Sequence, residues 1–327
     1  MPQIVVDKLI KTFSIAERTR GLIGAVKGLI HRSYRTVEAL RGLSFTVENG
    51  ELLGYIGPNG AGKSTTVKVL SGILVPDSGI CTVNGMTPWK HRTEYVRSIG
   101  AVFGQRTQLW WDLPVADSFD LLRDIYSIDT KRYRHSRDEL ISTLDLAPFL
   151  DVPTRQLSLG QRMRCDLAAS LLHEPKVLFL DEPTIGLDAV SKLAVRDFIR
   201  RINAERSVTV MLTTHDMDDI EALCSRVVLI DSGVISFDGT VRELRDAVPH
   251  ERSIVVDLIE PIDPPPVDDR IAFVRREGHR VWFSYDPDTM NAPAAIKAIT
   301  AVCAISDLFL ENPPIEHIVA SLYGQRK

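Results

Sequence analysis

The middle of the chain alternates short apolar runs with longer segments of helical periodicity. The runs KVLFLD, VTVMLTT and RVVLID are rich in β-branched residues and end at turn residues, which is typical of buried strands. Helical patterns lie between them, so the sequence predicts an α/β domain. The earlier runs IVVDKLI, LSFTVENGE and ICTVNG lie closer together, which predicts an added antiparallel portion.

A second pattern begins near residues 248–250. The segments SIVVDLIE, AFVRREGHRVWFSYD and ISDLFLE resemble strands, and NAPAAIKAITAV has the pattern of a helix. Three adjacent prolines, Pro264 to Pro266, fit an extended connection better than the interior of a sheet. We therefore predict a first domain over residues 1–247 and a small α+β domain over residues 248–327, which carries no motif of recognisable chemistry.

Composition narrows the class of protein. The length of 327 residues fits two unequal domains, and a charged fraction of 25% with a net charge of -4 is ordinary for a soluble protein. The chain lacks the basic character of a nucleic-acid binder. Its four scattered cysteines form no CxxC pair and fit a reducing compartment. No apolar run reaches the roughly 18 residues of a membrane span, so a role at a membrane would require another chain to cross it.

A glycine-rich segment, GPNGAGKS, follows the apolar run LLGYI and precedes a helical pattern. This is the context of a P-loop, in which backbone N–H groups and a helix N-terminus surround phosphates. We expect Lys63 to reach the β and γ phosphates and Ser64 to bind Mg²⁺; a simple turn between strand and helix is the alternative. The predicted phosphate contacts are Gly57, Pro58, Asn59, Gly60, Ala61, Gly62, Lys63, Ser64 and Thr65.

Two carboxylates follow the apolar run KVLFL, at the end of a strand where α/β proteins bind their ligands. After a P-loop, Asp181 is expected to hold Mg²⁺ and Glu182 to polarise the attacking water as a general base. An acidic strand end without catalytic function is the alternative for either residue alone.

The segment RQLSLGQRMRCDL has two interpretations that do not exclude each other. Ser158 and Gln161 have the spacing of a capping box at a helix N-terminus. Ser158 and the N–H of Gly160 would also form an exposed anion site in the first turn of that helix.

In combination, these motifs resemble the nucleotide-binding subunits of ATP-binding-cassette (ABC) transporters over about the first 245 residues. The order of motifs matches: P-loop, Gln105 in VFGQ, LSLGQ, LFLDEPT, Ile185 to Asp188 as the D-loop, and His215 in TTHD. The resemblance implies an α/β P-loop NTPase cassette with a RecA-like core, an antiparallel β portion and a helical subdomain over about residues 106–172. The small α+β domain would follow it as an accessory unit.

The resemblance also assigns roles. Gln105 would touch Mg²⁺ and the attacking water, His215 would act at the γ-phosphate, and Phe13 would stack on adenine. ATP would lie between the P-loop of one subunit and the LSLGQ motif of a second, identical or related one. The residues expected to contact the nucleotide from that motif and the D-loop are Ser158, Gly160, Gln161 and Asp188. Leu159 stands where this family usually has glycine, and we expect it to point aside and leave the clamp competent.

Partners follow from the same resemblance. Trp110 and Trp111, just after Gln105, lie where the family's ATPase meets its membrane permease, although packing in the core is an alternative for one of them. The motifs look most like export-type ATPases with a separately encoded six-helix permease, at the cytoplasmic face of the membrane, with no nucleic-acid partner. A soluble ABC-type ATPase acting on macromolecular assemblies is the alternative, and the sequence does not identify the substrate.

The chain departs from the family between Ser14 and Val37, where the first hairpin is usually shorter. One helical face holds Leu22, Val26, Leu29 and Ile30 beside basic residues, so a short amphipathic helix that touches lipid or permease is one prediction. Three glycines weaken such a helix, and a plain surface insertion is the other.

Overall fold

The computed structural model describes residues 2–16, 34–104, 106–246, 252–260, 267–311 and Val319. Contacts divide the chain into two units, Met1–Val241 and Arg242–Lys327. The boundary that the sequence predicts, after residue 247, falls in a stretch outside the described residues and stays a prediction.

A six-stranded sheet forms the centre of the first unit, in the order β5-β6-β7-β3-β8-β9. All pairings are parallel except β8 with β9. Every residue of β3 and β7 is buried, as expected of parallel strands covered on both faces, and this explains the continuous apolar runs. The strands are β3 (Leu52–Ile56), β5 (Ile99–Phe103), β6 (Val177–Asp181), β7 (Thr209–Thr213), β8 (Arg226–Asp231) and β9 (Val234–Thr240).

Three helices of this unit bear on the site described below. They are α2 (Lys63–Leu70), α7 (Ala189–Arg206) and α8 (Met217–Leu223). Each follows the carboxyl end of a neighbouring central strand: α2 after β3, α7 after β6 and α8 after β7. The loops that carry the predicted motifs therefore meet at one edge of the sheet.

The predicted antiparallel portion is a second sheet of three strands, in the order β2-β1-β4. It consists of β1 (Ile4–Ala16), β2 (Tyr34–Val47) and β4 (Ser78–Val83). Helix α2 contacts β2 and β4 of this sheet and β6 of the other, and Val67 and Leu70 of that helix belong to the shared core. The P-loop is therefore held between two packed sheets.

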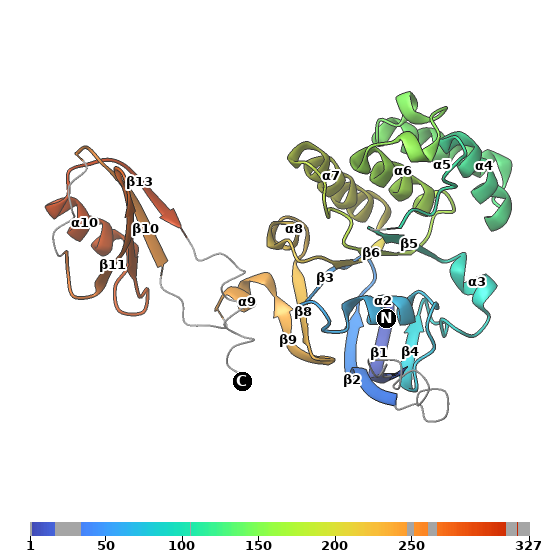
Figure 1. The fold of residues 1–327 in the computed structure, drawn as a ribbon, viewed down its shortest axis with the longest axis horizontal. Coiled ribbons are helices and arrows are strands. Elements are labelled where there is room, and N and C mark those ends of the chain that lie inside the picture. Colours follow the sequence, from blue (N-terminus) through green and yellow to red (C-terminus); the bar gives the residue numbers. More distant parts are fainter. Residues whose placement is uncertain are drawn as a thin grey trace, which may run out of the picture. The chain divides into compact units, whose positions relative to one another are not determined.

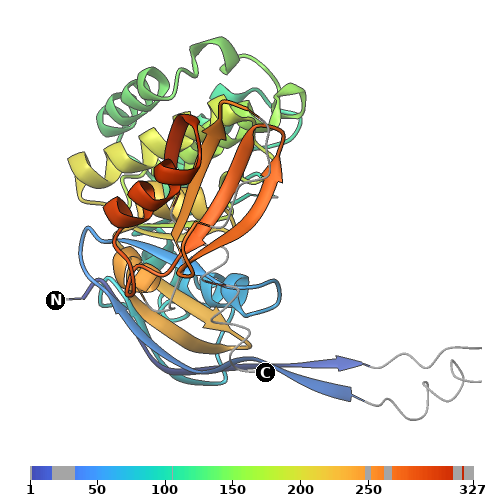
Figure 2. The same cartoon turned by 90° about the vertical axis from the view of Figure 1, so that its left-hand side faces the viewer.

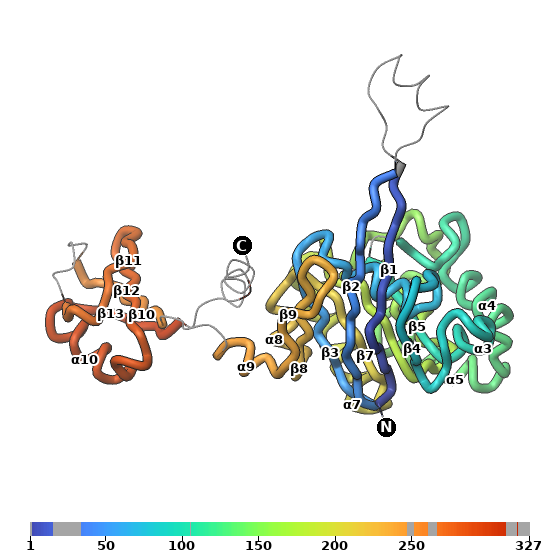
Figure 3. The backbone as a smooth tube through the Cα atoms, turned by 90° about the horizontal axis from the view of Figure 1, so that it is seen from below, coloured from blue at the N-terminus to red at the C-terminus, as the bar shows by residue number. Residues whose placement is uncertain are grey.

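Strands β1 and β2 continue as a long hairpin beyond the body of the first unit (Figures 2 and 3). Ser14 pairs with Thr36 and Ala16 with Tyr34. These residues extend the two strands, so the departure that the sequence places between Ser14 and Val37 begins and ends within this hairpin. The predicted amphipathic residues Leu22, Val26, Leu29 and Ile30 lie outside the described part of the chain.

Helices dominate the stretch between Arg106 and Leu172, drawn in green in Figure 1. Asp129 caps α5 by accepting hydrogen bonds from the backbone N–H groups of Lys131 and Arg132, and Ser158 caps α6. Helix α6 contacts β5, α4, α5 and α7, so the LSLGQ segment is tied to the central sheet. The helices are α4 (Val115–Tyr126), α5 (Thr130–Thr143) and α6 (Leu159–Leu171), with short 3₁₀ turns at Ala147–Phe149 and Thr154–Gln156. A short helix, α3 (Arg92–Val96), precedes β5.

In its described residues, the second unit is an antiparallel sheet, in the order β11-β12-β10-β13, together with helices, as predicted for an α+β domain. Val256, Phe283 and Ile299 lie in its own buried core. Its elements are α9 (Val241–Asp246), β10 (Arg252–Leu258), β11 (Ile271–Glu277), β12 (Arg280–Tyr285), α10 (Ala292–Val302) and β13 (Ile305–Glu311). Among the described residues of both units, no helix is long and apolar enough to cross a bilayer.

Candidate functional site

The glycine-rich loop joins β3 to α2 and depends on two glycines. A Cβ at Gly57 would lie 2.3 Å from the carbonyl oxygen of Ile230, so any side chain there would displace β8. Gly62 has a φ of +113°, and a Cβ on it would approach the carbonyl oxygen of Ala39 to 2.7 Å. These close approaches hold the loop in a tight turn that leads into α2.

Lys63 lies inside this turn and is only 7% exposed. Its Nζ donates hydrogen bonds to the carbonyl oxygens of Gly57 at 2.7 Å and Pro58 at 3.1 Å. Burial lowers the pKa of Lys63, whereas the negative charges of Glu182 and Asp181 act in the opposite direction. A cavity of about 180 Å³ opens here, lined by Ala39, Asn59, Gly60, Gly62, Lys63, Ser64, Thr65 and Glu182. The structure therefore brings together most of the predicted phosphate-binding residues with one of the predicted carboxylates.

Asp181, at the end of β6, points toward the P-loop helix. Its Oδ1 accepts a hydrogen bond from the Thr213 hydroxyl at 2.5 Å and lies 3.5 Å from the Ser64 hydroxyl. Thr213 ends β7, the neighbouring strand, and sequence reasoning did not assign it a role. The threonine that begins the TTHD motif was the available signal. Because Thr213 fixes the carboxylate, Asp181 and Ser64 present a pair of hard oxygen ligands from two elements.

Glu182 begins the next turn with a φ of +56°, which is uncommon for a residue with a side chain. Its backbone N–H donates to the carbonyl oxygen of Thr213 at 2.9 Å, and its Oε1 lies 3.4 Å from Nδ1 of His215. The two residues predicted to act at the γ-phosphate are thus adjacent. His215 is more than half exposed, so its ring remains accessible from solvent.

Gly104 is a second residue that sequence reasoning missed. A Cβ on it would lie 2.1 Å from the carbonyl oxygen of Glu182, and its N–H donates to the carbonyl oxygen of Asp181 at 2.8 Å. Its position directly before Gln105 in VFGQ was the available signal. Gln105 lies outside the described residues, so its predicted contacts with metal and water stay a prediction.

Phe13 and Ala61 complete the predicted cofactor contacts near the P-loop. Phe13 is half-buried on β1, where the Lys11 ammonium lies 5.6 Å from the centre of its ring, and it is not among the residues that line the P-loop cavity. Ala61 is buried, and its carbonyl oxygen accepts a hydrogen bond from the N–H of Gly233 at 2.9 Å. Adenine stacking by Phe13 therefore stays a prediction.

The LSLGQ segment forms a capping box. The Ser158 hydroxyl accepts from the N–H of Gln161 at 3.2 Å, and the Gln161 side chain accepts from the N–H of Ser158 at 2.9 Å. Ser158 itself is exposed, and neither it nor Gly160 lines the P-loop cavity of the same chain. The helix N-terminus is therefore free to meet a ligand brought by another subunit.

Gly160 and Leu159 pack against the D-loop of their own chain. A Cβ at Gly160 would lie 2.5 Å from the Ser191 hydroxyl, and a Cβ at Gly186 would lie 3.0 Å from Cδ2 of Leu159. Leu159 thus turns toward Gly186. Asp188 is exposed and caps α7, and hydrogen bonds from the N–H and hydroxyl of Ser191 lower its pKa.

Trp110 and Trp111 are 38% and 51% exposed. The Arg162 guanidinium lies 5.8 Å from the centre of the Trp111 ring, so this aromatic surface continues onto α6. Two half-exposed tryptophans on the helical stretch form the kind of surface that protein interfaces bury.

Comparison with known proteins identifies the family. The model of the family described as "ABC transporter" matches residues 40–185. The chain is 31% identical to the doxorubicin resistance ATP-binding protein DrrA of Mycobacterium tuberculosis over 299 residues, or 88% of each chain. It is 36% identical over 66% of its length to the probable sulfate/thiosulfate import ATP-binding protein CysA of Chlorella vulgaris, covering 91% of that protein. A solved ATP-binding subunit of an ABC transporter shares the fold, with a TM-score of 0.63 at 23% identity over 75% of this chain and 92% of the other.

Proposed function

The chain belongs to the family of ABC transporter ATP-binding proteins, and from this premise we propose that it binds ATP with Mg²⁺ between two cassettes and powers export through a separate permease. The observation that supports this best is the cavity beside Lys63, into which the P-loop, the start of α2 and Glu182 all project. The family's reaction is hydrolysis of ATP to ADP and phosphate.

Phosphate binding rests on the P-loop. Its turned N–H groups, the N-terminus of α2 and the Lys63 ammonium group supply positive potential around the β and γ phosphates. Among the described residues, the Nζ of Lys63 donates hydrogen bonds to backbone carbonyl oxygens and forms no ion pair. It can therefore exchange these acceptors for phosphate oxygens without breaking an ion pair. We therefore expect Lys63→Ala to lose most ATP affinity and keep its fold.

Mg²⁺ fits the oxygen ligands of this edge of the sheet. The described residues contain no group of three or more His, Cys, Asp or Glu that could hold a metal ion alone. Mg²⁺ is commonly bound by one or two protein oxygens together with substrate phosphates, which suits the Ser64 hydroxyl and the Asp181 carboxylate. The ion would neutralise charge on the phosphates.

Glu182 is the proposed general base. Its carboxylate projects into the P-loop cavity and lies beside His215, so a water above the phosphates could donate its proton to Glu182 while the imidazole orients the γ-phosphate. Gly104 supports this role, since only glycine permits the close approach that fixes the backbone of Glu182.

The second half of the site would come from another cassette. At the N-terminus of α6, the hydroxyl of the exposed Ser158 and the N–H of Gly160, which is buried in the single chain, would meet the γ-phosphate of a partner subunit. ATP would then favour the closed dimer, and hydrolysis would release it. The molar mass of the isolated chain in solution with ATP can show whether the partner is an identical chain or a related one.

Export through a permease at the cytoplasmic face of the membrane is the finer part of the proposal. The likeness to the export-type DrrA extends over 299 residues and so into the second unit, whereas the likeness to the import protein CysA covers 217 residues. Half-exposed Trp110 and Trp111 offer a docking surface for the membrane partner. The alternative is a soluble ATPase without a membrane partner, and no specific observation favours it.

The test has two parts. Purified chain should release phosphate from ATP in the presence of Mg²⁺, and Lys63→Ala should abolish both binding and release. Tagged chain expressed with its native gene neighbours should then co-purify with a membrane protein whose substrate accumulates inside cells that lack the ATPase. Failure of any membrane protein to co-purify with the active chain would favour the soluble alternative, and loss of uptake rather than efflux would reverse the direction of transport.

A further inference from the structure

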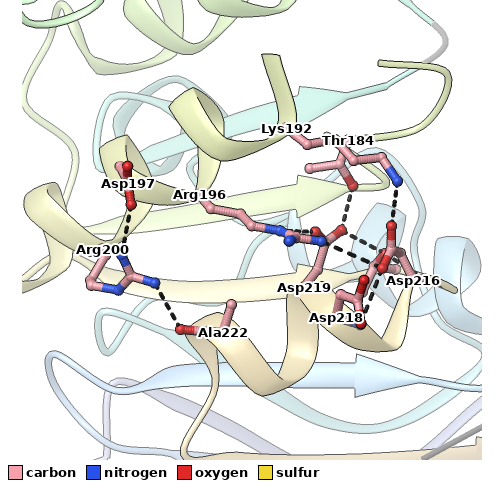
Figure 4. A network of polar contacts seen from close by, with 10 residues as sticks. Thr184, Lys192, Arg196, Asp197, Arg200, Asp216, Asp218, Asp219 and Ala222 are labelled. Atoms are coloured by element: carbon pink, nitrogen blue, oxygen red, sulfur yellow. Dashed lines mark hydrogen bonds and ion pairs between the residues drawn. The ribbon is translucent and has the colours of Figure 1, made fainter. Parts of the chain in front are cut away.

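Asp219, in the first turn of α8, is a carboxylate with no solvent exposure. Its Oδ1 accepts a hydrogen bond from Nε of Arg196 at 2.5 Å, and its Oδ2 accepts one from the Thr214 hydroxyl at 3.1 Å. The Thr184 hydroxyl also donates to Oδ2. Figure 4 shows Thr184 and Arg196 converging on this carboxylate from different elements. Since a buried carboxylate without partners is strongly unfavourable, these groups are held together.

Two partners of Asp219 flank the D-loop of the proposed site. Thr184 is two residues after Glu182 and directly before the D-loop, residues 185–188. Arg196 lies on α7, the helix that Asp188 caps after the D-loop. The D-loop is thus anchored on both sides to one carboxylate.

The third partner lies on the other side of the site. Thr214 is the residue before His215, and its hydroxyl also accepts a hydrogen bond from the N–H of Asp216 at 3.0 Å, which closes the turn around the histidine. Asp219 therefore connects the segment that carries His215 with the segment that carries Glu182 and the D-loop.

A second carboxylate reinforces the same junction. Asp216 lies 2.5 Å from Nζ of Lys192 and 3.5 Å from a terminal nitrogen of Arg196. Two carboxylates thus face two cations from the first turns of α7, and Arg196 contacts both (Figure 4). These contacts tie α7 to the turn that carries His215, and a hydrogen-bond network whose members satisfy one another in this way is rigid.

We propose that Asp219 is a positioning residue that couples the D-loop to His215, so that contact of a second cassette with the D-loop aligns His215 and Glu182 for hydrolysis. The inference rests on the proposed function, because the D-loop must meet a partner cassette. Asp219 touches no part of the P-loop cavity. Removal of the Thr184 or the Thr214 hydroxyl should therefore lower kcat and leave the KM for ATP unchanged.

Two substitutions each remove one hydroxyl group that binds Asp219 and leave the Asp219–Arg196 contact in place. Thr184→Val removes the hydroxyl beside the D-loop, and Thr214→Val removes the one beside His215. We expect each to lower kcat for ATP by about tenfold, the effect of one lost hydrogen bond in an aligned site. KM should stay within about twofold of its original value. Thr184→Ser, which restores a hydroxyl, should recover most of the rate.

The chain offers a matched control on the same helix. Asp197 and Arg200 form an ion pair on the exposed face of α7, with side chains 72% and 54% exposed, and Figure 4 shows it beside the buried network. Asp197→Asn should change neither kcat nor KM. Thermal unfolding of every variant separates effects on alignment from effects on the fold.

The outcomes distinguish this inference from the function on which it rests. If the unmodified chain hydrolyses no ATP, the proposed function fails first. If the unmodified chain is active and Thr184→Val matches it in kcat, Asp219 is only a structural anchor and the inference is wrong. If Thr184→Val has a lower unfolding temperature but an unchanged kcat, Asp219 is likewise only a structural anchor. If Thr184→Val does not fold, Thr214→Val carries the test with the same expected separation of kcat from KM.

Discussion

Asp166 on α6 permits a quantitative prediction, because its charge is buried with well-defined partners. It is 3% exposed, and its Oδ1 accepts hydrogen bonds from the Thr107 hydroxyl at 2.8 Å and the N–H of Gln108 at 3.0 Å. Burial raises the pKa of Asp166 from 3.8 to about 6, against the opposing effect of those two hydrogen bonds. Asp166→Asn removes the charge and keeps an Oδ1 that can accept both bonds.

The sign of the effect on stability follows from the raised pKa. Above pH 6 the carboxylate is charged in the folded and unfolded states, so the folded state carries the full cost of burying it. As the pH falls from 6 toward 4, the folded state takes up a proton before the unfolded chain does, and stability relative to a neutral side chain rises. The interval between 3.8 and about 6 corresponds to about 3 kcal/mol at 1.36 kcal/mol per pH unit.

Urea unfolding of the original chain and of Asp166→Asn at several pH values measures this directly. At pH 8 we expect the variant to be more stable by up to about 3 kcal/mol, and near pH 5 by about 1.5 kcal/mol. Asp197→Asn, on the exposed face of α7, is the control. A variant that is less stable than the original at pH 8, or a difference that does not change with pH, would refute the reasoning.

Three further predictions concern the site. Gly104→Ala should lower ATP turnover by at least about tenfold, because its Cβ would lie 2.1 Å from the carbonyl oxygen of Glu182; slower phosphate release with unchanged ATP binding is the expected pattern. Ser158→Ala should abolish ATP-driven dimerisation measured by light scattering, whereas loss of a cap alone would chiefly cost about 1 kcal/mol of stability. Trp111→Ala should weaken co-purification of the permease and leave ATP hydrolysis by the isolated chain unchanged, and equal recovery of the permease would exclude this tryptophan from the interface.

Much of the first unit was predictable because its signals are local. The parallel strands β3 and β7 are buried along their whole length, so each appears in the sequence as a continuous apolar run. The P-loop depends on glycines at fixed spacing, and Ser158 with Gln161 forms the capping box that its spacing predicts. These features follow from neighbouring residues alone.

Other parts depend on partners that are distant in the sequence. The sequence bounds an insertion by Ser14 and Val37, and it does not reveal that Ser14 pairs with Thr36 and Val37 with Phe13, so that both residues belong to two long strands. The roles of Gly104 and Thr213 come from contacts with Glu182 and Asp181, which lie at the end of β6. No local pattern reveals such contacts, because they exist only once the sheet has assembled.

The central claim is that ATP is bound between two cassettes and that Glu182 is the general base for its hydrolysis, which allows the dimer to separate. The most direct test is the molar mass of Glu182→Gln in solution with ATP and Mg²⁺. We predict a stable dimer of twice the 36.5 kDa chain mass with ATP and a monomer without nucleotide. A variant that binds ATP and remains monomeric would contradict the shared site, and rapid hydrolysis by the same variant would exclude Glu182 as the essential base.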